Sequence, residues 1–323
     1  MRLSVLDQSP VGEGSSHADA LLSSVDLAQA AEEWGFARYW TAEHHGSPGF
    51  AGSAPEILAA VLLARTSRMP VGTGGALLPR YPPAKVAEVF AVLASLYPGR
   101  VDMGLGRAGG PAADYPERVR LLRRLLGMDG RAGDGTAEAE ADRLVGAPAV
   151  PPRMWLLGAG AGSARMAGEL GTDFAFAHFL APDQAEGALA AYRGLLAGRN
   201  AAAGSPGVLA VRAVTAESEA EAEALAHSVL LWRARKDLGE DLPLPPARAA
   251  RNHRWTSLEA ERAYARERGL VWGTPEQVHT RLAGLAEAYA VEEVMVNTLT
   301  CDPADRLRSY RLLTEVRGAT VQV

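Results

Sequence analysis

The feature that most constrains this chain is the alternation of short apolar runs with helical segments along nearly its whole length. Eight of these runs have the length and composition of strands. The predicted strands cover residues 3–8, 37–44, 70–78, 99–107, 153–160, 172–180, 207–216 and 292–299. Because parallel strands need long crossover connections, this alternation predicts a parallel sheet covered by helices.

An eight-fold count favours a closed (β/α)₈ barrel over an open sheet, and barrels of this kind run to about 250 residues as one unit. We therefore interpret residues 1–323 as a single barrel domain. The rhythm breaks between Lys236 and Glu259, where "LPLPP" occurs, and residues 236–259 are predicted to form a long insertion. The last predicted strand and a final helix follow it.

Charge and cysteine content narrow the class of protein. The formal net charge is −5 and no long basic run occurs, which argues against nucleic acid or an anionic membrane as the partner. No apolar run approaches the roughly 18 residues of a membrane span. The single cysteine, Cys301, excludes an intramolecular disulfide and a cysteine-rich zinc site. A reducing, cytoplasmic location is expected.

Chemistry in such barrels gathers at the carboxyl ends of the strands. The second strand ends in Glu43, His44 and His45, and alternation places Glu43 and His45 on one side and His44 on the other. A histidine can transfer a proton near neutral pH, whereas the structural alternative is a polar pair that anchors a loop. The "EHH" sequence lacks the i, i+4 spacing of a helical zinc site, so no metal is predicted.

The third and fourth strands end in residues suited to a ligand. Gly72, Gly74 and Gly75 indicate either close approach of a flat ligand or a bend at a barrel corner. Arg107 follows the fourth strand, where a fixed cation suits an anionic ligand. A salt bridge from Arg107 to a neighbouring loop is the alternative.

The fifth strand is followed by a glycine-rich turn and a helix, "LLGAGAGSARMAGELG". Small residues let backbone N–H groups approach an anion, and the helix start adds partial positive charge. Ser163 can cap this helix or bind a phosphate. The dinucleotide fingerprint is incomplete, since a third glycine is absent at position 163, so a mononucleotide phosphate fits better. His178, at the end of the sixth strand, is either a core residue or a ligand contact.

Six ordered motifs carry a family resemblance: "LSVLDQSP", "RYWTAEHH", "SAPEIL", "GTGGALLPRYPPAKVAEVF", "LYPGRVDMGLGRA" and "WLLGAGAGSARMAGELGTDFAFAHF". Together they resemble the bacterial luciferase-like flavin-dependent monooxygenases, most closely the shorter group that has "LDQSP" at its start. The resemblance covers nearly the whole chain and is strongest over residues 1–108 and 151–180. It implies a (β/α)₈ barrel that binds FMN at its carboxyl-terminal mouth.

The resemblance also assigns residues. The catalytic histidine of the family falls on His44, with His45 bracing the loop. The FMN ring is expected over the third strand, with a non-prolyl cis peptide at Gly74–Gly75 or Gly75–Ala76, and the phosphate at the turn after the fifth strand. The residues implied to contact the cofactor are Glu43, Gly74, Gly75, Ala76, Arg107, Ala159, Gly160, Gly162, Ser163, Ala177 and His178.

The implied activity is monooxygenation of a small organic substrate. Reduced FMN would react with O₂ to give a C4a-peroxide in a dry pocket, with His44 handling a proton. The insertion at 236–259 is expected to act as a mobile lid. The phosphate turn is poorer in serine than is usual in the family, and "AGGP" replaces the usual "APG-D" after Arg107. Weak flavin retention and a separate flavin reductase are therefore expected.

Two rival functions remain open from the residues. The same fold could use the deazaflavin F420 for hydride transfer, or the chain could bind flavin without turnover. The "EHH" pair weighs against mere binding, because binding needs no proton shuttle. A homodimer formed through the helices at 54–66 and 84–97 is a further expectation from the resemblance.

Overall fold

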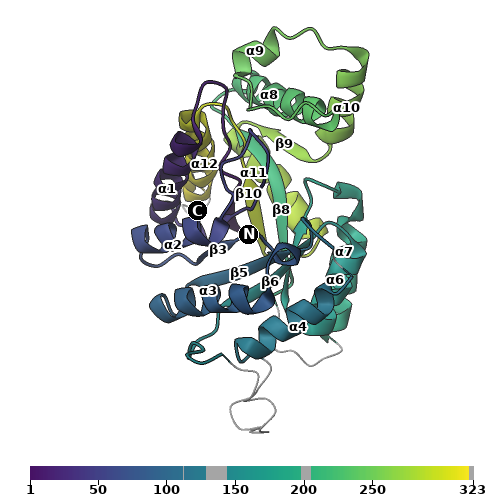
Figure 1. Cartoon of the computed structure of the whole chain (residues 1–323). Coiled ribbons are helices and arrows are strands. Elements are labelled where there is room, and N and C mark those ends of the chain that lie inside the picture. Colours follow the sequence, from purple (N-terminus) through teal and green to yellow (C-terminus); the bar gives the residue numbers. More distant parts are fainter. Residues whose placement is uncertain (112, 129–143, 198–204, 320–323) are drawn as a thin grey trace.

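Eight parallel strands close into a barrel in the computed structural model, which describes residues 1–111, 113–128, 144–197 and 205–319 (Figure 1). The barrel order is β1–β2–β3–β5–β6–β7–β8–β10, and β10 pairs with both β8 and β1 to complete the circle. These strands are β1 (Arg2–Asp7), β2 (Tyr39–Thr41), β3 (Val71–Thr73), β5 (Val101–Gly106), β6 (Arg153–Gly158), β7 (Asp173–Ala177), β8 (Val208–Thr215) and β10 (Glu293–Asn297). The predicted (β/α)₈ barrel is confirmed.

Helices surround the barrel, as the sequence pattern predicts (Figure 1). They are α1 (His17–Glu33), α2 (Pro55–Arg65), α3 (Pro83–Leu96), α4 (Tyr115–Leu125), α6 (Ala161–Leu170), α7 (Ala185–Ala197), α8 (Glu219–Asp237), α9 (Ala247–Arg251), α10 (Ser257–Glu267), α11 (Pro275–Ala288) and α12 (Pro303–Ala319). Short 3₁₀ turns occur at Leu78–Arg80 and Pro182–Gln184. Among the described residues, no helix is long and apolar enough to cross a membrane.

Three parts of the chain differ from the predicted elements. The third predicted strand is divided into β3 and β4 (Ala76–Leu77), because the backbone turns at Gly74. The segment 236–259 is not a simple loop: it contains α9 and the start of α10, which begins with a capping box at Thr256 and Glu259. An additional strand, β9 (Leu270–Gly273), pairs with β8 and was missed by the sequence analysis.

Side chains divide the core into two layers, as alternation along the strands requires. Inside the barrel, Leu6, Trp40, Trp155, Ala175 and Met295 form one apolar cluster. Outward-facing strand residues pack with the surrounding helices in a larger cluster, represented by the following side chains: Val5, Tyr39, Phe90, Met103, Phe174, Phe176, Leu209 and Leu282.

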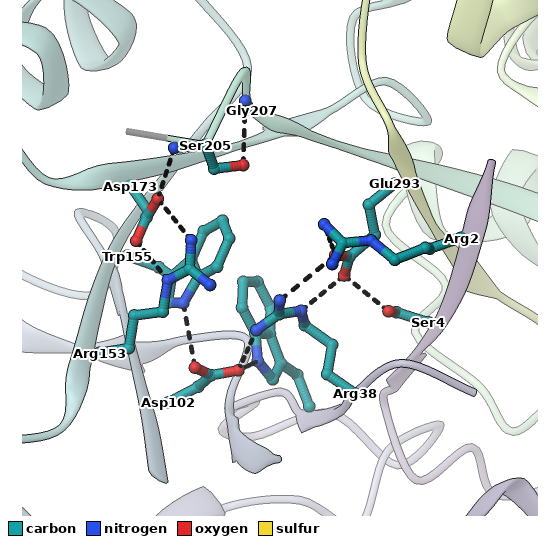
Figure 2. A network of polar contacts seen from close by, with 11 residues as sticks. Arg2, Ser4, Arg38, Asp102, Arg153, Trp155, Asp173, Ser205, Gly207 and Glu293 are labelled. Carbon is teal, nitrogen blue, oxygen red and sulfur yellow. Dashed lines mark hydrogen bonds and ion pairs between the residues drawn. The ribbon is translucent and has the colours of Figure 1, made fainter. Parts of the chain in front are cut away.

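The amino-terminal end of the barrel is closed by a charged network (Figure 2). Arg38 donates to Glu293 Oε1 at 2.5 Å and to Asp102 Oδ2 at 2.6 Å. Asp102 also accepts the indole N–H groups of Trp40 at 2.8 Å and Trp155 at 3.2 Å. The Arg38 guanidinium lies 4.8 Å from the centroid of the Trp155 ring. Every buried charge named here therefore has an opposite partner.

A helical lobe formed by α8, α9 and α10 lies beyond the opposite, carboxyl-terminal end of the strands (Figure 1). The segment between α8 and α9 is attached to the loop after β1: the Leu244 N–H donates to the Val11 carbonyl at 2.9 Å, and Leu244 is fully buried. It is attached to the loop after β2 by Ser47, whose hydroxyl donates to Asp241 at 2.9 Å. The insertion predicted from sequence thus borders the mouth of the barrel.

Candidate active site

Glu43 anchors the segment that follows β3. Its buried carboxylate accepts the Leu77 N–H at 2.7 Å, the Tyr81 hydroxyl at 2.7 Å and the ring of His45 at 2.5 Å. Burial and this hydrogen bond raise the pKa of Tyr81 to about 12. The predicted placement of Glu43 and His45 on one side is confirmed. The carboxylate oxygens are occupied by protein donors, so Glu43 holds residues 77–81 in position.

His44 points the other way and occupies a packed site. Its backbone N–H donates to the Gly52 carbonyl at 2.7 Å, and its ring stacks on Phe50 with centroids 4.2 Å apart. Its Nε2 lies 3.1 Å from the side-chain nitrogen of Gln8. Its Nδ1 is buried and has no hydrogen-bond partner among the described residues. An unpartnered buried nitrogen costs stability, so such an atom is a candidate for contact with a ligand.

Arg212 determines which nitrogen of His44 carries the proton. A guanidinium only donates, so the Gln8 oxygen, 3.2 Å from Arg212 Nη2, must be the acceptor. The Gln8 amide nitrogen then donates to His44 Nε2. Neutral His44 therefore carries its proton on Nδ1, the atom without a protein partner. Arg212 is itself oriented by Asn297, whose side-chain oxygen accepts from Arg212 Nε at 3.1 Å.

Burial lowers the pKa of His44 to about 4, and the positive charges of Lys236 and Arg212 add to this effect. The imidazole is consequently neutral throughout the physiological pH range. Neutral imidazole with a protonated Nδ1 can donate a hydrogen bond or exchange a proton at that atom.

An aromatic wall joins His44 to the helical lobe. Phe50 meets the Trp232 indole edge-on, with centroids 5.4 Å apart, and Trp232 is almost fully buried in α8. The Lys236 ammonium lies 5.1 Å from the centroid of the Phe50 ring. The lobe therefore supplies one wall of the site around His44.

A floor of small residues lies at the end of β3. The Gly74–Gly75 peptide bond is cis, as predicted from the family resemblance. A Cβ on Gly74 would lie 2.7 Å from a methyl carbon of Leu6, and one on Gly75 would lie 2.8 Å from the Gly104 carbonyl. Only glycine fits at these positions without displacement of the barrel wall. Ala76 follows and is buried in β4.

The turn after β6 presents the first turn of α6 at the mouth. Gly160 is the N-cap of α6, so the predicted capping role of Ser163 is wrong: Ser163 is the third residue of the helix. A Cβ on Gly158 would lie 2.3 Å from that of Ser163, so glycine is needed for this close packing. Ala161 and Gly162 are exposed, and their N–H groups belong to the turn that lacks intrahelical acceptors. Ala159 is half-buried before the cap.

Arg107 is exposed just beyond β5, and no ion-pair partner for it is found within the described part of the chain. The salt bridge considered as an alternative is therefore not observed among those residues. Burial raises the pKa of the nearby Tyr115 hydroxyl, and the charge of Arg107 opposes that shift. Arg107 is thus a cation at the mouth that is available to an anion.

His178 and Ala177 face opposite ways at the end of β7. Ala177 pairs in register with Ala210 and continues the inward row of Ala175. His178 instead packs near the Tyr289 ring, with centroids 5.9 Å apart, and borders a surface groove between α7 and α11. The structure does not bring His178 to the group around His44.

Sequence reasoning missed the polar residues that orient His44, namely Gln8, Arg212 and Asn297. A signal for one of them was present, because Arg212 is the only charged residue in the apolar run Val208–Thr215. Within the described ranges, no group of three or more histidine, cysteine, aspartate or glutamate side chains could hold a metal ion.

Comparison with known proteins identifies the family. The model of the luciferase-like monooxygenases matches residues 1–292. The chain belongs to this family. An uncharacterized Bacillus subtilis protein, YwcH, is 38% identical over 97% of this chain and 98% of its own length. The crystal structure of apo-MsnO8 matches this luciferase-like monooxygenase with a TM-score of 0.84 and 35% identity, covering 98% of each chain. The chain is accordingly an oxidoreductase with the luciferase-like barrel.

Two further relatives bear on substrate and cofactor. The N-acetyl-S-alkylcysteine monooxygenase of Bacillus subtilis is 31% identical over 98% of each chain. The F420-dependent hydroxymycolic acid dehydrogenase of Mycobacterium tuberculosis is 33% identical over 64% of this chain and 61% of its own length. Relatives of this chain are thus named as a monooxygenase and as an F420-dependent dehydrogenase.

Proposed function

We propose that this luciferase-like protein is a monooxygenase that uses reduced FMN and O₂ to oxidise a small organic substrate. The observation that carries the proposal is the buried, unpartnered Nδ1 of His44, at the same end of the barrel as the small-residue floor and the exposed start of α6. Mere storage of a flavin would not need a neutral histidine whose proton is directed to an unpartnered atom. When bound, reduced FMN supplies the electrons that activate O₂.

The first turn of α6 would hold the FMN phosphate. Its exposed N–H groups and the partial positive charge of the helix start favour an anion. Gly160 and Gly162 leave backbone uncovered, and a Cβ on Gly162 would meet nothing within 4 Å. Ala159 and Ser163 border this turn, and Arg107 adds a positive charge at the mouth.

The ring system would lie over the Gly74–Gly75–Ala76 floor, where no side chain larger than a methyl group intrudes. Glu43 acts on this site through residues 77–81, which it fixes by hydrogen bonds. Ala177 contributes a small inward surface. His178, which faces the α7–α11 groove, would influence the cofactor only through its backbone.

His44 would donate or exchange the proton at Nδ1. Gln8 and Arg212 keep the opposite nitrogen as an acceptor, so the proton stays on the side of the candidate site. Phe50 and Trp232 exclude water from the other face of the ring. The segment 236–259 would act as the lid, because it contacts the loops after β1 and β2 and carries Lys236 to the Phe50 ring.

A charge placed in the phosphate site tests the cofactor proposal. Gly162→Asp adds a carboxylate in open space at the first turn of α6, and Gly162→Ala is the matched neutral control. Repulsion between the added carboxylate and the phosphate should weaken FMN binding about tenfold or more in Gly162→Asp, whereas Gly162→Ala should change it little. Flavin fluorescence titration measures both. Equal affinity in the two variants would show that the phosphate lies elsewhere. Tighter binding of F420 than of FMN by the wild-type protein would identify F420 as the cofactor.

A separate reductase would supply the reduced FMN. The sequence motif at the α6 turn lacks the full dinucleotide fingerprint, which supports a partner enzyme for nicotinamide oxidation. The test is product formation with reduced FMN alone: activity with NADH and oxidised FMN, in the absence of any reductase, would contradict this part of the proposal.

A homodimer is supported by exposed apolar side chains on the two helices named from the resemblance. Ile57 and Val61 on α2 are 63% and 42% exposed, and Val92 and Leu96 on α3 are 59% and 66% exposed. Val92→Glu should give a monomer in light scattering. Leu22→Glu, which changes an exposed side chain on α1 outside these two helices, should leave the dimer intact. A wild-type monomer would refute the dimer.

A further inference from the structure

Arg212 is a buried cation without an acid. Its exposed fraction is 8%, and its guanidinium donates to the neutral side-chain oxygens of Gln8 and Asn297. No carboxylate lies within ion-pair distance of it among the described residues. Burial lowers its pKa to about 9, and the positive charges of Arg233 and Arg266 add to this effect. A buried charge is costly without a counter-charge, and no counter-charge for Arg212 is found in the part of the chain that the structure describes.

The guanidinium borders a small cavity between the barrel and the helical lobe. The cavity is enclosed by Phe179, Leu180, Val229, Leu230, Gly269 and Leu270, together with three arginines: Arg212, Arg233 and Arg266. Its lining contains no acidic side chain. The Arg212 guanidinium lies 4.8 Å from the centroid of the Phe179 ring, and this contact helps to hold the guanidinium in place. The cavity has a volume of about 20 Å³, which is the space of about one water molecule, so it leaves the charge of Arg212 uncompensated without itself holding an organic molecule.

Asp237 is the one carboxylate attached to this cluster. It accepts from Arg266 Nε at 2.7 Å and from Arg233 Nη2 at 2.5 Å, so it holds the two outer arginines and does not reach Arg212. Three cations thus share one acid. The uncompensated positive charge is that of Arg212, which donates to Gln8, the residue that orients His44.

From this arrangement we infer that the Arg212 guanidinium binds the anionic group of the substrate, a carboxylate or sulfonate carried on a short apolar chain. The inference rests on the proposed function, because it assigns the substrate of that same site. Only Gln8 separates Arg212 from His44 in the hydrogen-bond chain, so an anion on Arg212 would lie close to His44. It would also link occupancy to the catalytic histidine through Gln8.

The test uses small anions whose binding does not depend on flavin. Butanoate and butane-1-sulfonate are the charged probes, and butanamide is the neutral control of similar shape. Calorimetry on the full-length protein without flavin measures each affinity. We expect butanoate or butane-1-sulfonate, or both, to bind about tenfold or more tightly than butanamide, since a charge-assisted hydrogen bond is lost in the amide. The stronger of the two acids identifies the anion class.

Three variants locate the site. Arg212→Gln should weaken binding of the anions about tenfold, whereas Arg268→Gln, which removes an exposed arginine paired with Asp183, should change it less than about twofold. Asp237→Asn should act in the opposite direction and tighten anion binding, because it frees positive charge next to the cavity. This variant keeps the test decisive even if Arg212→Gln folds poorly.

Equal binding of butanoate and butanamide, no binding of either acid, or tightening absent in Asp237→Asn would overturn the inference. Loss of FMN affinity in Arg212→Gln without anion binding by any form would assign the guanidinium to the flavin and would also overturn it. None of these outcomes depends on Gly162, so failure here and failure of the cofactor proposal are distinguishable.

Discussion

Arg38 and Arg212 are the same residue type, both buried inside the same barrel, at opposite ends. Each lies 4.8 Å from the centroid of an aromatic ring. Arg38, at the amino-terminal end, is paired with two carboxylates, Asp102 and Glu293, and these partners raise its pKa. Arg212, at the carboxyl-terminal end, has only neutral partners, and its pKa is lowered.

Unpartnered polar atoms follow the same division. Within the described residues, the buried side-chain atoms without a hydrogen bond are His44 Nδ1, His178 Nδ1 and Thr215 Oγ1. All three belong to the carboxyl ends of strands or the residues just after them. The buried polar groups at the amino-terminal end are paired with one another, whereas the carboxyl-terminal end has buried polar atoms that form no hydrogen bond within the described protein. The comparison teaches that stability and function have been assigned to different ends of one barrel, as in other barrels of this type.

The largest expected difference is between the two arginines. Arg38→Met leaves Asp102 and Glu293 buried without a cation and should lower the free energy of unfolding by about 3–5 kcal/mol. Arg212→Met removes an unpaired charge but leaves two amide oxygens without a donor, so the opposing effects should keep the change within about 1 kcal/mol. Urea denaturation of both variants measures the contrast. Equal losses would remove the distinction between the two ends.

Glu43 gives an intermediate effect, because it is an internally satisfied carboxylate at the mouth. The Glu43 carboxylate accepts hydrogen bonds from three protein groups. Glu43→Gln replaces one of its oxygens by an amide nitrogen that cannot accept, and should destabilise the protein by about 1–3 kcal/mol. The pKa of Tyr81 should fall from about 12 toward its ordinary value of 10.0. Ultraviolet titration of Glu43→Gln against Glu43→Gln/Tyr81→Phe isolates that tyrosine. An unchanged titration would show that Glu43 does not control the segment.

His44 gives the smallest effect, which appears only in acid. Its pKa is lowered from 6.5 to about 4 in the folded protein, so the unfolded chain binds more protons between those values. The stability contributed by neutral His44 is present above about pH 6.5 and is lost as the pH falls through about 4. His44→Gln should therefore show a shallower loss of stability over this range than wild type. Parallel slopes in His44→Gln and wild type would contradict the burial of His44.

Much of the fold could be predicted from sequence because it depends on local periodicity. Each of the eight predicted strands overlaps a barrel strand, and the cis peptide at Gly74–Gly75 was anticipated through the family resemblance. The missed elements, α10 and β9, follow the proline-rich stretch, where the regular alternation of strands and helices in the sequence is interrupted. Their start signal, the Thr256–Glu259 capping box, is a local feature that was present in the sequence.

The site was less predictable because it depends on contacts between distant parts of the chain. His44 was found from its position after a strand, but the chain of hydrogen bonds through Gln8 to Arg212 joins residues 204 positions apart. The direction of His178 could not be read from an apolar strand that is buried on both faces. The register of β7 places Ala177 opposite Ala210, and the contact with Tyr289 places His178 on the other side.

The most direct test of the central claim is anaerobic titration with reduced FMN, followed by rapid mixing with oxygenated buffer, in wild type and His44→Ala. We expect saturable binding in both proteins, with reoxidation of the bound flavin slower than that of free reduced FMN. We also expect altered reoxidation kinetics in His44→Ala, since the proton at Nδ1 is lost. Absence of binding, or bound flavin that reoxidises at the free rate in both proteins, would contradict that claim.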